Sequence, residues 1–188
     1  AAGIETAILP TAVLSTHTGG FSGWTFRDLT DDIPAITDHW EKEGLSFDAI
    51  YTGYLGSARQ IEMVKDLFAR LAAPDCVKIV DPAMADNGKL YHGFTPEFVS
   101  AMTELCSKAD IVIPNITEAL LMLGEEYRSE YDEEFIRSLL KRLTDGGARC
   151  VALTGISFES DKIGVYYYDK TTDSYFYYCN EKLPVSYH

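Results

Sequence analysis

The sequence predicts an α/β fold of three layers, α/β/α, around a mostly parallel sheet with a β-hairpin near the C-terminal end. Short apolar runs alternate with helical patterns in four strand–loop–helix units, an alternation that is typical of parallel sheets. Two β-rich runs follow, Ile163–Tyr168 and Ser174–Cys179, joined by a short polar segment. Because so few residues separate them, we expect these two runs to pair as an antiparallel hairpin.

The first unit combines a strand-like stretch, Ile4–Leu14, with a polar loop that ends in two glycines, Ser15–Gly20. Glycines in such a loop allow the backbone to approach a ligand closely, although an ordinary turn explains them equally well. Thr30 or Asp31 then caps a predicted helix, since both side chains can accept a hydrogen bond from the first turn.

The second unit begins with a strand over Phe47–Tyr51 and continues through a loop with two glycines, Thr52–Ser57. Ser57 is predicted to cap a helix whose apolar residues recur at helical spacing as far as Leu71. A helix N-terminus after a glycine loop can hold an anion, but every α/β protein has several such sites.

The third unit contains the most informative stretch of the chain. A mostly apolar strand, Val77–Val80, ends at Asp81, and Pro82 stops it because proline cannot donate to a ladder. Asp86 and the turn signal Asn87-Gly88 follow in the loop. Ligands of open α/β sheets bind beyond the carboxyl ends of strands, so the two acids indicate a cation or phosphate site. The alternative is that Asp81 caps a turn and Asp86 is only solvated.

Thr95 is predicted to cap a helix that runs through Ser107, and the fourth unit begins with the short strand Asp110–Ile113. Asn115 lies in the loop after this strand, and Glu118 falls in the first turn of the next helix. A carboxylate there interacts well with the helix dipole, so a simple capping role is one interpretation. The other is that Glu118 faces the same rim as Asp81.

A further helix over Phe135–Leu143 leads to the strand Cys150–Leu153, which finishes at Thr154. In every unit the unusual residues come where the strand ends. They are Thr18, Gly19, Gly53, Tyr54, Asp81, Asn115, Glu118 and Thr154. Since parallel strands end at one edge, we expect a shared site on one rim of the sheet, but this pattern names no reaction.

Composition limits the classes of function. The 188 residues fit one domain, and 16 basic against 29 acidic residues give a net charge of −13. This charge argues against binding nucleic acid through its phosphates, but not against a small anion bound with a metal ion. The four cysteines are far apart and indicate reduced thiols in a cytoplasmic protein. No apolar run approaches the 18 residues of a membrane span, so we expect no membrane partner.

Four motifs occur in order and together resemble the pyridoxal/pyridoxamine (vitamin B6) kinase branch of the ribokinase-like superfamily. They are SxHTGG-x3-W at Ser15–Trp24, TGYLGS at Thr52–Ser57, DPAMADNGKLY at Asp81–Tyr91 and PNITEA at Pro114–Ala119. The resemblance extends over essentially the whole chain. It implies a ribokinase-like fold and transfer of the ATP γ-phosphoryl group to the 5′-hydroxymethyl of pyridoxal, pyridoxamine or pyridoxine.

The resemblance also implies roles for the substrate and lid residues. By position, Thr18 and Gly19 contact the pyridine substrate, and Tyr54 lies against its ring. Asp86 and Tyr91 belong to the loop that closes over the site.

For the nucleotide, the resemblance implies that Asp81 and Glu118 organise Mg²⁺ and the phosphates through water, with Asn115 beside them and Thr154 next to the nucleotide. It further implies a monovalent cation such as K⁺ and a homodimer. Metal binding explains how an acidic protein can hold ATP, because the metal supplies positive charge.

The sequence departs from the family at both ends. Nothing before Ala1 supplies the family's first strand with its substrate-contacting serine, and the Gly-x-Gly-Asp motif expected soon after His188 is absent. We therefore interpret residues 1–188 as a single kinase domain without those two segments, and we assign no catalytic base. His188, the nearest titratable residue, is not expected to take that role, and residues 1–188 alone are expected to show no phosphorylation.

Two alternatives stay open. The first keeps the superfamily but makes hydroxymethylpyrimidine the substrate. The second is a non-catalytic α/β domain that binds a ligand at the rim without a base. Neither the preferred B6 vitamer nor the oligomeric state follows from the sequence.

Overall fold

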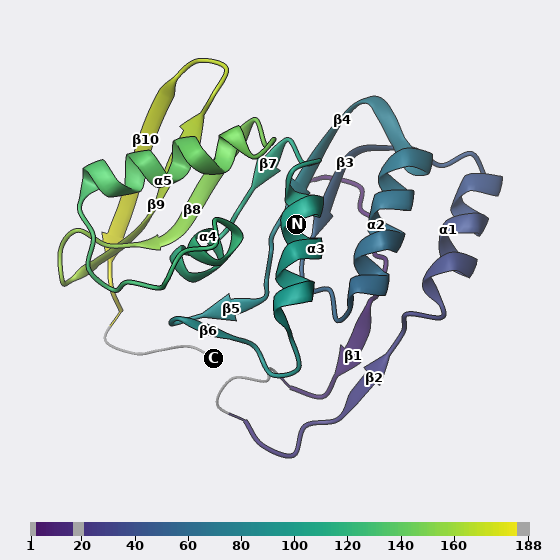
Figure 1. Cartoon of the computed structure of the whole chain (residues 1–188). Helices are drawn as coiled ribbons and strands as arrows, with labels where there is room; N and C mark the ends of the chain where they lie inside the picture. The colour runs from purple at the N-terminus through teal and green to yellow at the C-terminus, as the bar shows by residue number, and fades with distance from the viewer. Residues whose placement is uncertain (1–2, 17–20, 184–188) are drawn as a thin grey trace.

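The computed structural model describes residues 3–16 and 21–183 and contains a six-stranded sheet in the order β10-β9-β8-β7-β4-β3 (Figure 1). The sheet strands are β3 (Phe47–Thr52), β4 (Ala72–Val80), β7 (Ile111–Val112), β8 (Cys150–Ile156), β9 (Lys162–Asp169) and β10 (Ser174–Glu181). Strands β3, β4, β7 and β8 run parallel, whereas β9 and β10 are antiparallel to their neighbours. The predicted α/β class, mostly parallel sheet and C-terminal hairpin are therefore confirmed.

The parallel strands end in register. Val80 of β4 is paired with Thr52 of β3 on one side and with Val112 of β7 on the other. Val112 is paired in turn with Val151 of β8. The residues that follow Thr52, Val80 and Val112 therefore emerge at one edge of the sheet, as the alternation of strands and helices predicts.

In the described part of the chain, five helices connect the strands: α1 (Ile33–Lys42), α2 (Ala58–Leu71), α3 (Pro96–Cys106), α4 (Ile116–Met122) and α5 (Glu133–Asp145). Ser57 and Thr95 cap α2 and α3 as predicted, each accepting a hydrogen bond from the N–H three residues on. The predicted cap of α1 is wrong, because that helix follows Asp32, whose side chain makes no capping bond. Among the described helices, none has both the length and the apolar character needed to cross a bilayer.

The core lies between one face of the sheet and the helices that pack on it (Figure 1). Fully buried members include Ile61, Leu71, Met102, Leu105, Leu120, Ile136, Leu139 and Leu140. On the opposite face Tyr51 and Phe176 are 58% and 62% exposed, and no helix of the described residues covers it. Of the three predicted layers, the described residues thus form the sheet and one helical layer.

The expectation that the strand ending at Leu14 belongs to the main sheet is wrong. Only Ala12–Leu14 is extended as β1, and it pairs antiparallel with β2 (Phe26–Asp28) in a separate ribbon. The carbonyl of Thr11 accepts a hydrogen bond of 3.1 Å from the N–H of Leu29, which follows β2, and another of 3.0 Å from the Gln60 side chain. Pro10 has no N–H to donate, which favours an end of strand pairing just before β1.

The loop after β4 forms a small hairpin that the sequence predicts only as a turn. Strands β5 (Ala85–Asp86) and β6 (Lys89–Leu90) pair across Asn87 and Gly88, whose φ angles are +50° and +76°. Two consecutive residues with positive φ make the tight turn that suits the twist of a hairpin, and Asn-Gly is the preferred pair for it.

Two strand boundaries also differ from the predictions. β4 begins at Ala72, five residues before the predicted Val77, and its pairing with β3 is irregular there. β8 continues past Thr154 to Ile156 because Gly155, with φ of +73°, forms a bulge that preserves the pairing with β9.

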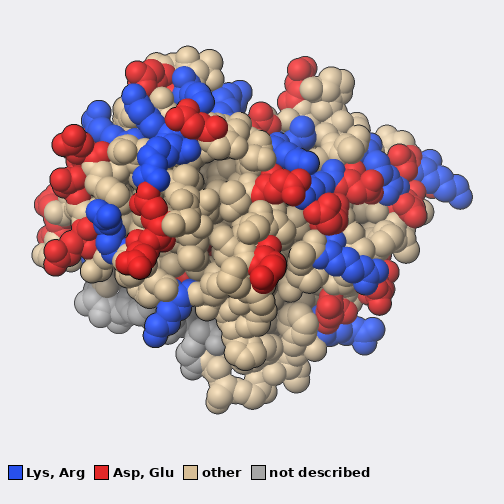
Figure 2. Space-filling model, in the orientation of Figure 1, with Lys and Arg blue, Asp and Glu red and all other residues tan. Residues whose placement is uncertain are grey.

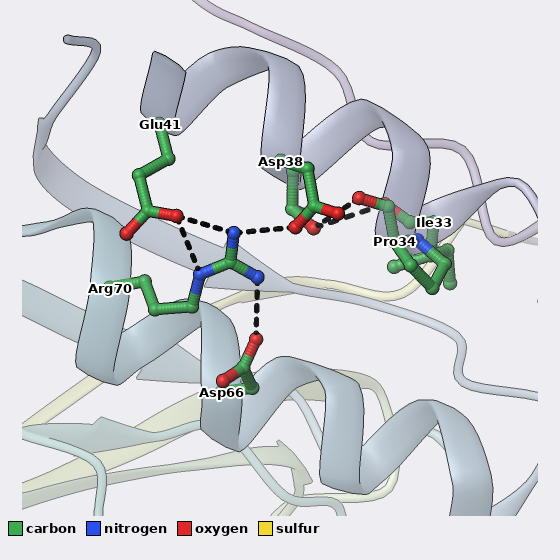
Figure 3. Close-up of polar contacts among 7 residues, drawn as sticks. Ile33, Pro34, Asp38, Glu41, Asp66 and Arg70 are labelled. Atoms are coloured by element: carbon green, nitrogen blue, oxygen red, sulfur yellow. Dashed lines mark hydrogen bonds and ion pairs between the residues drawn. The ribbon is translucent and has the colours of Figure 1, made fainter.

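Ion pairs connect the helices at the surface. The guanidinium of Arg70 on α2 binds Asp66 on its own helix and reaches across to Asp38 and Glu41 on α1 (Figure 3). Figure 2 shows acidic and basic side chains interspersed over this face of the molecule, in keeping with such pairs. Arg70 thereby links α1 to α2, which packs directly on β4.

We expect Gly147→Ala to destabilise the fold more than Gly124→Ala, although both glycines have positive φ, +130° and +71°. A Cβ at Gly147 would lie 2.5 Å from the carbonyl oxygen of Ser107, whereas one at Gly124 would meet no atom within 4 Å. Backbone strain should cost each variant about 1–2 kcal/mol, and the clash should cost Gly147→Ala about 1–3 kcal/mol more. Urea unfolding of both variants measures this difference, and equal losses would contradict the close contact.

Candidate functional site

The rim of the sheet brings together most of the polar residues expected at the strand ends. Asp81 directly follows β4, and its N–H donates to the carbonyl of Thr52 at the end of β3. Asn115 follows β7 and forms a parallel bridge with Thr154 of β8. Asp81, Asn115 and Thr154 therefore lie along one edge, on three neighbouring strands.

Asp81 is half-buried beside an exposed tyrosine. The hydroxyl of Tyr51 donates to Asp81 Oδ2 over 3.2 Å. Burial raises the pKa of the Asp81 carboxyl, and the hydrogen bonds from Tyr51 and the Ala83 backbone oppose this rise. The charged form of Asp81 is thus only partly compensated by the protein, which favours a cation near it.

Glu118 is the most buried acid of the rim, at 3% exposed. One of its oxygens accepts a hydrogen bond of 2.9 Å from the N–H of Asn115, and Asn115 Oδ1 accepts one of 3.0 Å from the N–H of Glu118. This reciprocal pair is a capping box at the N-terminus of α4. The capping interpretation of Glu118 is therefore correct, and its carboxylate nevertheless lies at the rim.

The second oxygen of Glu118 reaches the loop after β4. It accepts hydrogen bonds from the N–H groups of Met84, at 3.0 Å, and Ala85, at 3.4 Å. Burial, together with the smaller effect of the Asp81 charge, raises the pKa of Glu118 to about 7 against these three backbone hydrogen bonds. The negative charge of Asp81 therefore acts on Glu118, which indicates that the two carboxylates lie near each other at the rim.

Both ends of the Asn115 amide are occupied by the protein. Its Oδ1 caps Glu118, and its Nδ2 donates to the carbonyl of Ala85 over 2.7 Å. Thr154 donates twice to the carbonyl of Pro114, from its backbone N–H and from its hydroxyl. These contacts fix the loop between β7 and α4 against both the β5–β6 hairpin and β8.

Tyr54 lies in the loop between β3 and α2 and is 40% exposed. Its ring stacks on Phe94, with centroids 5.9 Å apart, and Phe94 also contacts the rings of Tyr91 and Phe98. Sequence reasoning missed Phe94, because a single aromatic residue in a loop has no periodicity to mark it. The cluster joins Tyr54 to the segment that follows the β5–β6 hairpin.

The two predicted lid residues lie on or next to this hairpin. Both carboxylate oxygens of Asp86 bind Asn87, one its N–H and the other its side-chain amide. Tyr91 donates its N–H to the carbonyl of Met84, and its pKa is raised by burial and by the charges of Glu118, Asp86 and Asp81. Tyr91 is therefore near the acids of the rim.

The predictions for Thr18 and Gly19 fall outside the residues that the structure describes. Within the described part of the chain, no group of three or more His, Cys, Asp or Glu side chains could hold a metal ion by itself. A divalent cation at this rim would therefore need ligands beyond Asp81 and Glu118, such as water or the oxygens of an anionic ligand. Mg²⁺ is usually bound in this way, with one or two carboxylates plus phosphates.

We expect the buried Glu118 to make the metal-free protein less stable as pH rises. The folded state keeps the proton of Glu118 up to a pKa of about 7, whereas an unfolded glutamate loses it near 4.5. The unfolded state therefore binds fewer protons between these values, and the free energy of unfolding falls as pH rises through this window. At about 1.4 kcal/mol per pH unit, the loss between pH 5 and 7 is about 2 kcal/mol.

Glu118→Gln should remove this loss, and Glu130→Gln, a change at an exposed position, should retain it. Chemical unfolding of the three proteins at several pH values gives the slopes. A wild-type stability that rises from pH 5 to 7 by the same amount in all three proteins would show that Glu118 is ionised in the fold throughout.

Comparison with known proteins agrees with this geometry. Residues 10–186 match the family described as phosphomethylpyrimidine kinase. A pyridoxal kinase of Deinococcus radiodurans is 30% identical over 162 residues, which cover 82% of this chain and 53% of that protein. A pyridoxal kinase of Pseudomonas aeruginosa is 30% identical over 164 residues, which cover 83% of this chain and 54% of that protein. The chain thus spans about half the length of these relatives.

Solved structures give the same result for the fold. A protein of Bacteroides thetaiotaomicron described as a phosphomethylpyrimidine kinase superposes with a TM-score of 0.90 at 41% identity, over 95% of this chain and 61% of that one. A second crystal form of that protein, with pyridoxal, gives a TM-score of 0.88 at 42% identity, over 94% and 62%. Pyridoxal kinase of Lactobacillus plantarum superposes with a TM-score of 0.83 at 32% identity, over 95% of this chain and 63% of that one. The chain therefore belongs to the phosphomethylpyrimidine kinase family and has its ribokinase-like α/β fold.

Proposed function

We propose that the protein is an ATP-dependent kinase that phosphorylates the 5′-hydroxymethyl group of pyridoxal or a related B6 vitamer. The observation that carries this proposal is the common rim of Asp81 and Glu118 in a chain 42% identical to a protein solved with pyridoxal. Relatives at 30 to 32% identity are named pyridoxal kinases. Because the chain spans only part of those proteins, the activity is assigned to the protein in its full length.

The acids of the rim fit a magnesium–nucleotide site. All the candidate ligands carry oxygen, the donor that Mg²⁺ prefers, and burial leaves the charge of Asp81 only partly compensated. Asp81 and Glu118 would hold the ion, in part through water, and the bound ion would offset the charge of the transferring phosphoryl group. Thr154 would lie beside the nucleotide.

Asn115 has a different role in this proposal. Its amide is engaged at both ends within the protein, so it positions Glu118 and the loop after β4, and its place beside the nucleotide follows from that position. Positioning of this kind matters in phosphoryl transfer, where most of the catalysis comes from placing charges correctly.

The aromatic cluster around Tyr54 supports a planar substrate. Tyr54 is held on one side by Phe94 and remains 40% exposed, so part of its ring is accessible to a ligand. A pyridine ring could stack there, which contributes about 0.5–1.5 kcal/mol beyond simple burial. Thr18 and Gly19 would complete the substrate site, and Asp86 and Tyr91 would close over it. We assign no base to remove the proton of the substrate hydroxyl.

Hydroxymethylpyrimidine is the second candidate substrate, because the matching family is described as phosphomethylpyrimidine kinase. Its ring is also planar and carries a hydroxymethyl group, so the cluster around Tyr54 could accept either one. Phosphorylation assays with pyridoxal, pyridoxamine, pyridoxine and hydroxymethylpyrimidine, run side by side, separate the two proposals.

Further parts of the proposal rest mainly on the resemblance. We assign residues 1–188 to one kinase domain and propose Mg²⁺ and a monovalent cation such as K⁺ as activating ions. We also propose a homodimer. Four free cysteines, three of them buried, favour a reducing compartment such as the cytoplasm.

Asp81→Asn should lower turnover by about 10²–10³, the usual loss when a positioned electrostatic group is removed from an active site. The fold should be nearly unchanged, because the substitution is isosteric and the hydroxyl of Tyr51 can still donate to the amide oxygen. The measurement is the rate of vitamer phosphorylation at saturating Mg²⁺ and ATP in the full-length protein.

The matched control is Asp75→Asn, which removes the same charge from an exposed position on the same strand. It should leave turnover within about twofold of the wild type, since exposed charges away from the site are largely screened. Turnover that is unchanged in Asp81→Asn, or lowered equally in both variants, would remove Asp81 from the mechanism.

A further inference from the structure

The β5–β6 hairpin is held to the N-terminus of α4 by three side chains of that helix and its cap. Asn115 Nδ2 donates to the carbonyl of Ala85, and Glu118 accepts from the N–H groups of Met84 and Ala85. These contacts fasten the base of the hairpin. The third contact is at its tip, where Thr117 Oγ1 accepts a hydrogen bond of 3.0 Å from the N–H of Gly88.

The geometry of the turn explains why Gly88 needs this partner. In a two-residue hairpin turn the ladder pairs the flanking residues, here Asp86 and Lys89, and leaves the N–H of the second turn residue without a partner. Gly88 is that residue. Thr117 is 1% exposed, so its hydroxyl is fixed within the protein, and it satisfies this N–H.

A second contact fixes the same tip independently. Gly88 packs against the side chain of Tyr127, so closely that a Cβ at this position would lie 2.7 Å from the ring atom Cδ1. Tyr127 follows α4 in the chain, and a hollow lined by Gly88, Thr117, Leu121 and Tyr127 lies beside the contact. The hairpin is therefore held by contacts at its tip as well as at its base.

We propose that Thr117 is a positioning residue, which places the lid residues Asp86 and Tyr91 over the rim by holding the tip of the β5–β6 hairpin. This inference rests on the proposed kinase function. Asn115 and Glu118 belong to the site itself, so changes there cannot separate hairpin position from metal or phosphate binding. The hydroxyl of Thr117 accepts from the N–H of Gly88 at the tip, and it can be changed without removing a site residue.

The test uses Thr117→Val in the full-length protein, with Thr117→Ser as the matched control. Valine keeps the branched shape but cannot accept the hydrogen bond, whereas serine retains the hydroxyl. Amide hydrogen exchange of the peptide 84–91, followed by mass spectrometry, should be about two- to tenfold faster in Thr117→Val, as expected for the loss of one neutral hydrogen bond. Exchange in Thr117→Ser should stay near the wild-type rate.

Kinetics give the second readout. With Thr117→Val, kcat/KM for the vitamer should fall by about the same two- to tenfold factor, and Thr117→Ser should recover most of it. Exchange in the peptides of α2, remote from the hairpin, should be unchanged, which excludes general loosening. Tyr127→Leu tests the tip from its exposed side and should also accelerate exchange of residues 84–91.

The two readouts distinguish the possible failures. Unchanged exchange in both Thr117→Val and Tyr127→Leu would show that these side chains do not hold the tip of the hairpin. Faster exchange with unchanged kcat/KM would overturn the positioning role, because the hairpin would then move without effect on catalysis. A wild-type protein without kinase activity would refute the proposed function, and with it the positioning role, while the exchange data would still decide whether Thr117 holds the hairpin.

Discussion

The buried carboxylate of Glu118 is the interaction on which the rim depends. Removing a carboxylate from water is expensive, and three backbone N–H groups from two separate loops offset only part of that cost. The pKa of Glu118 stays near 7 as a result. A group held in this state responds strongly to any positive charge, because a nearby cation stabilises the carboxylate form that the protein alone leaves poorly compensated.

The same carboxylate also connects helix α4 to the β5–β6 hairpin. It caps α4, and through Met84 and Ala85 it fixes the start of the hairpin that carries Asp86 and leads to Tyr91. A ligand that draws Glu118 toward itself would therefore act on the helix and on the hairpin together. Glu118 therefore caps α4 and lies at the rim at the same time, with one carboxylate oxygen used for each contact.

Local side-chain chemistry made much of the structure predictable. Ser57 and Thr95 were identifiable as caps because their hydroxyls bond within one turn, and the rim followed from parallel strands that end at a common edge. The extent of β1 is not predictable from local pattern, since it depends on pairing with β2 and on a bond from the distant Gln60 to Thr11.

Contacts between distant segments account for the other omissions. Phe94 and Tyr91 meet Tyr54 only after the chain has folded, and Thr117 lies in a helix where a threonine carries no visible signal. The sequence predicts Gly88 as a turn residue, but the ring of Tyr127 that requires a glycine there comes from a later loop.

A crystal structure of the full-length protein with Mn²⁺ in place of Mg²⁺ and a non-hydrolysable ATP analogue tests whether Asp81 and Glu118 hold the metal. Anomalous scattering from manganese locates the ion independently of any assumption about the site. We expect manganese between the phosphates and the carboxylates of Asp81 and Glu118, with the nucleotide beside Thr154. Manganese and nucleotide bound away from this rim, with Glu118 still bonded only to backbone N–H groups, would contradict it.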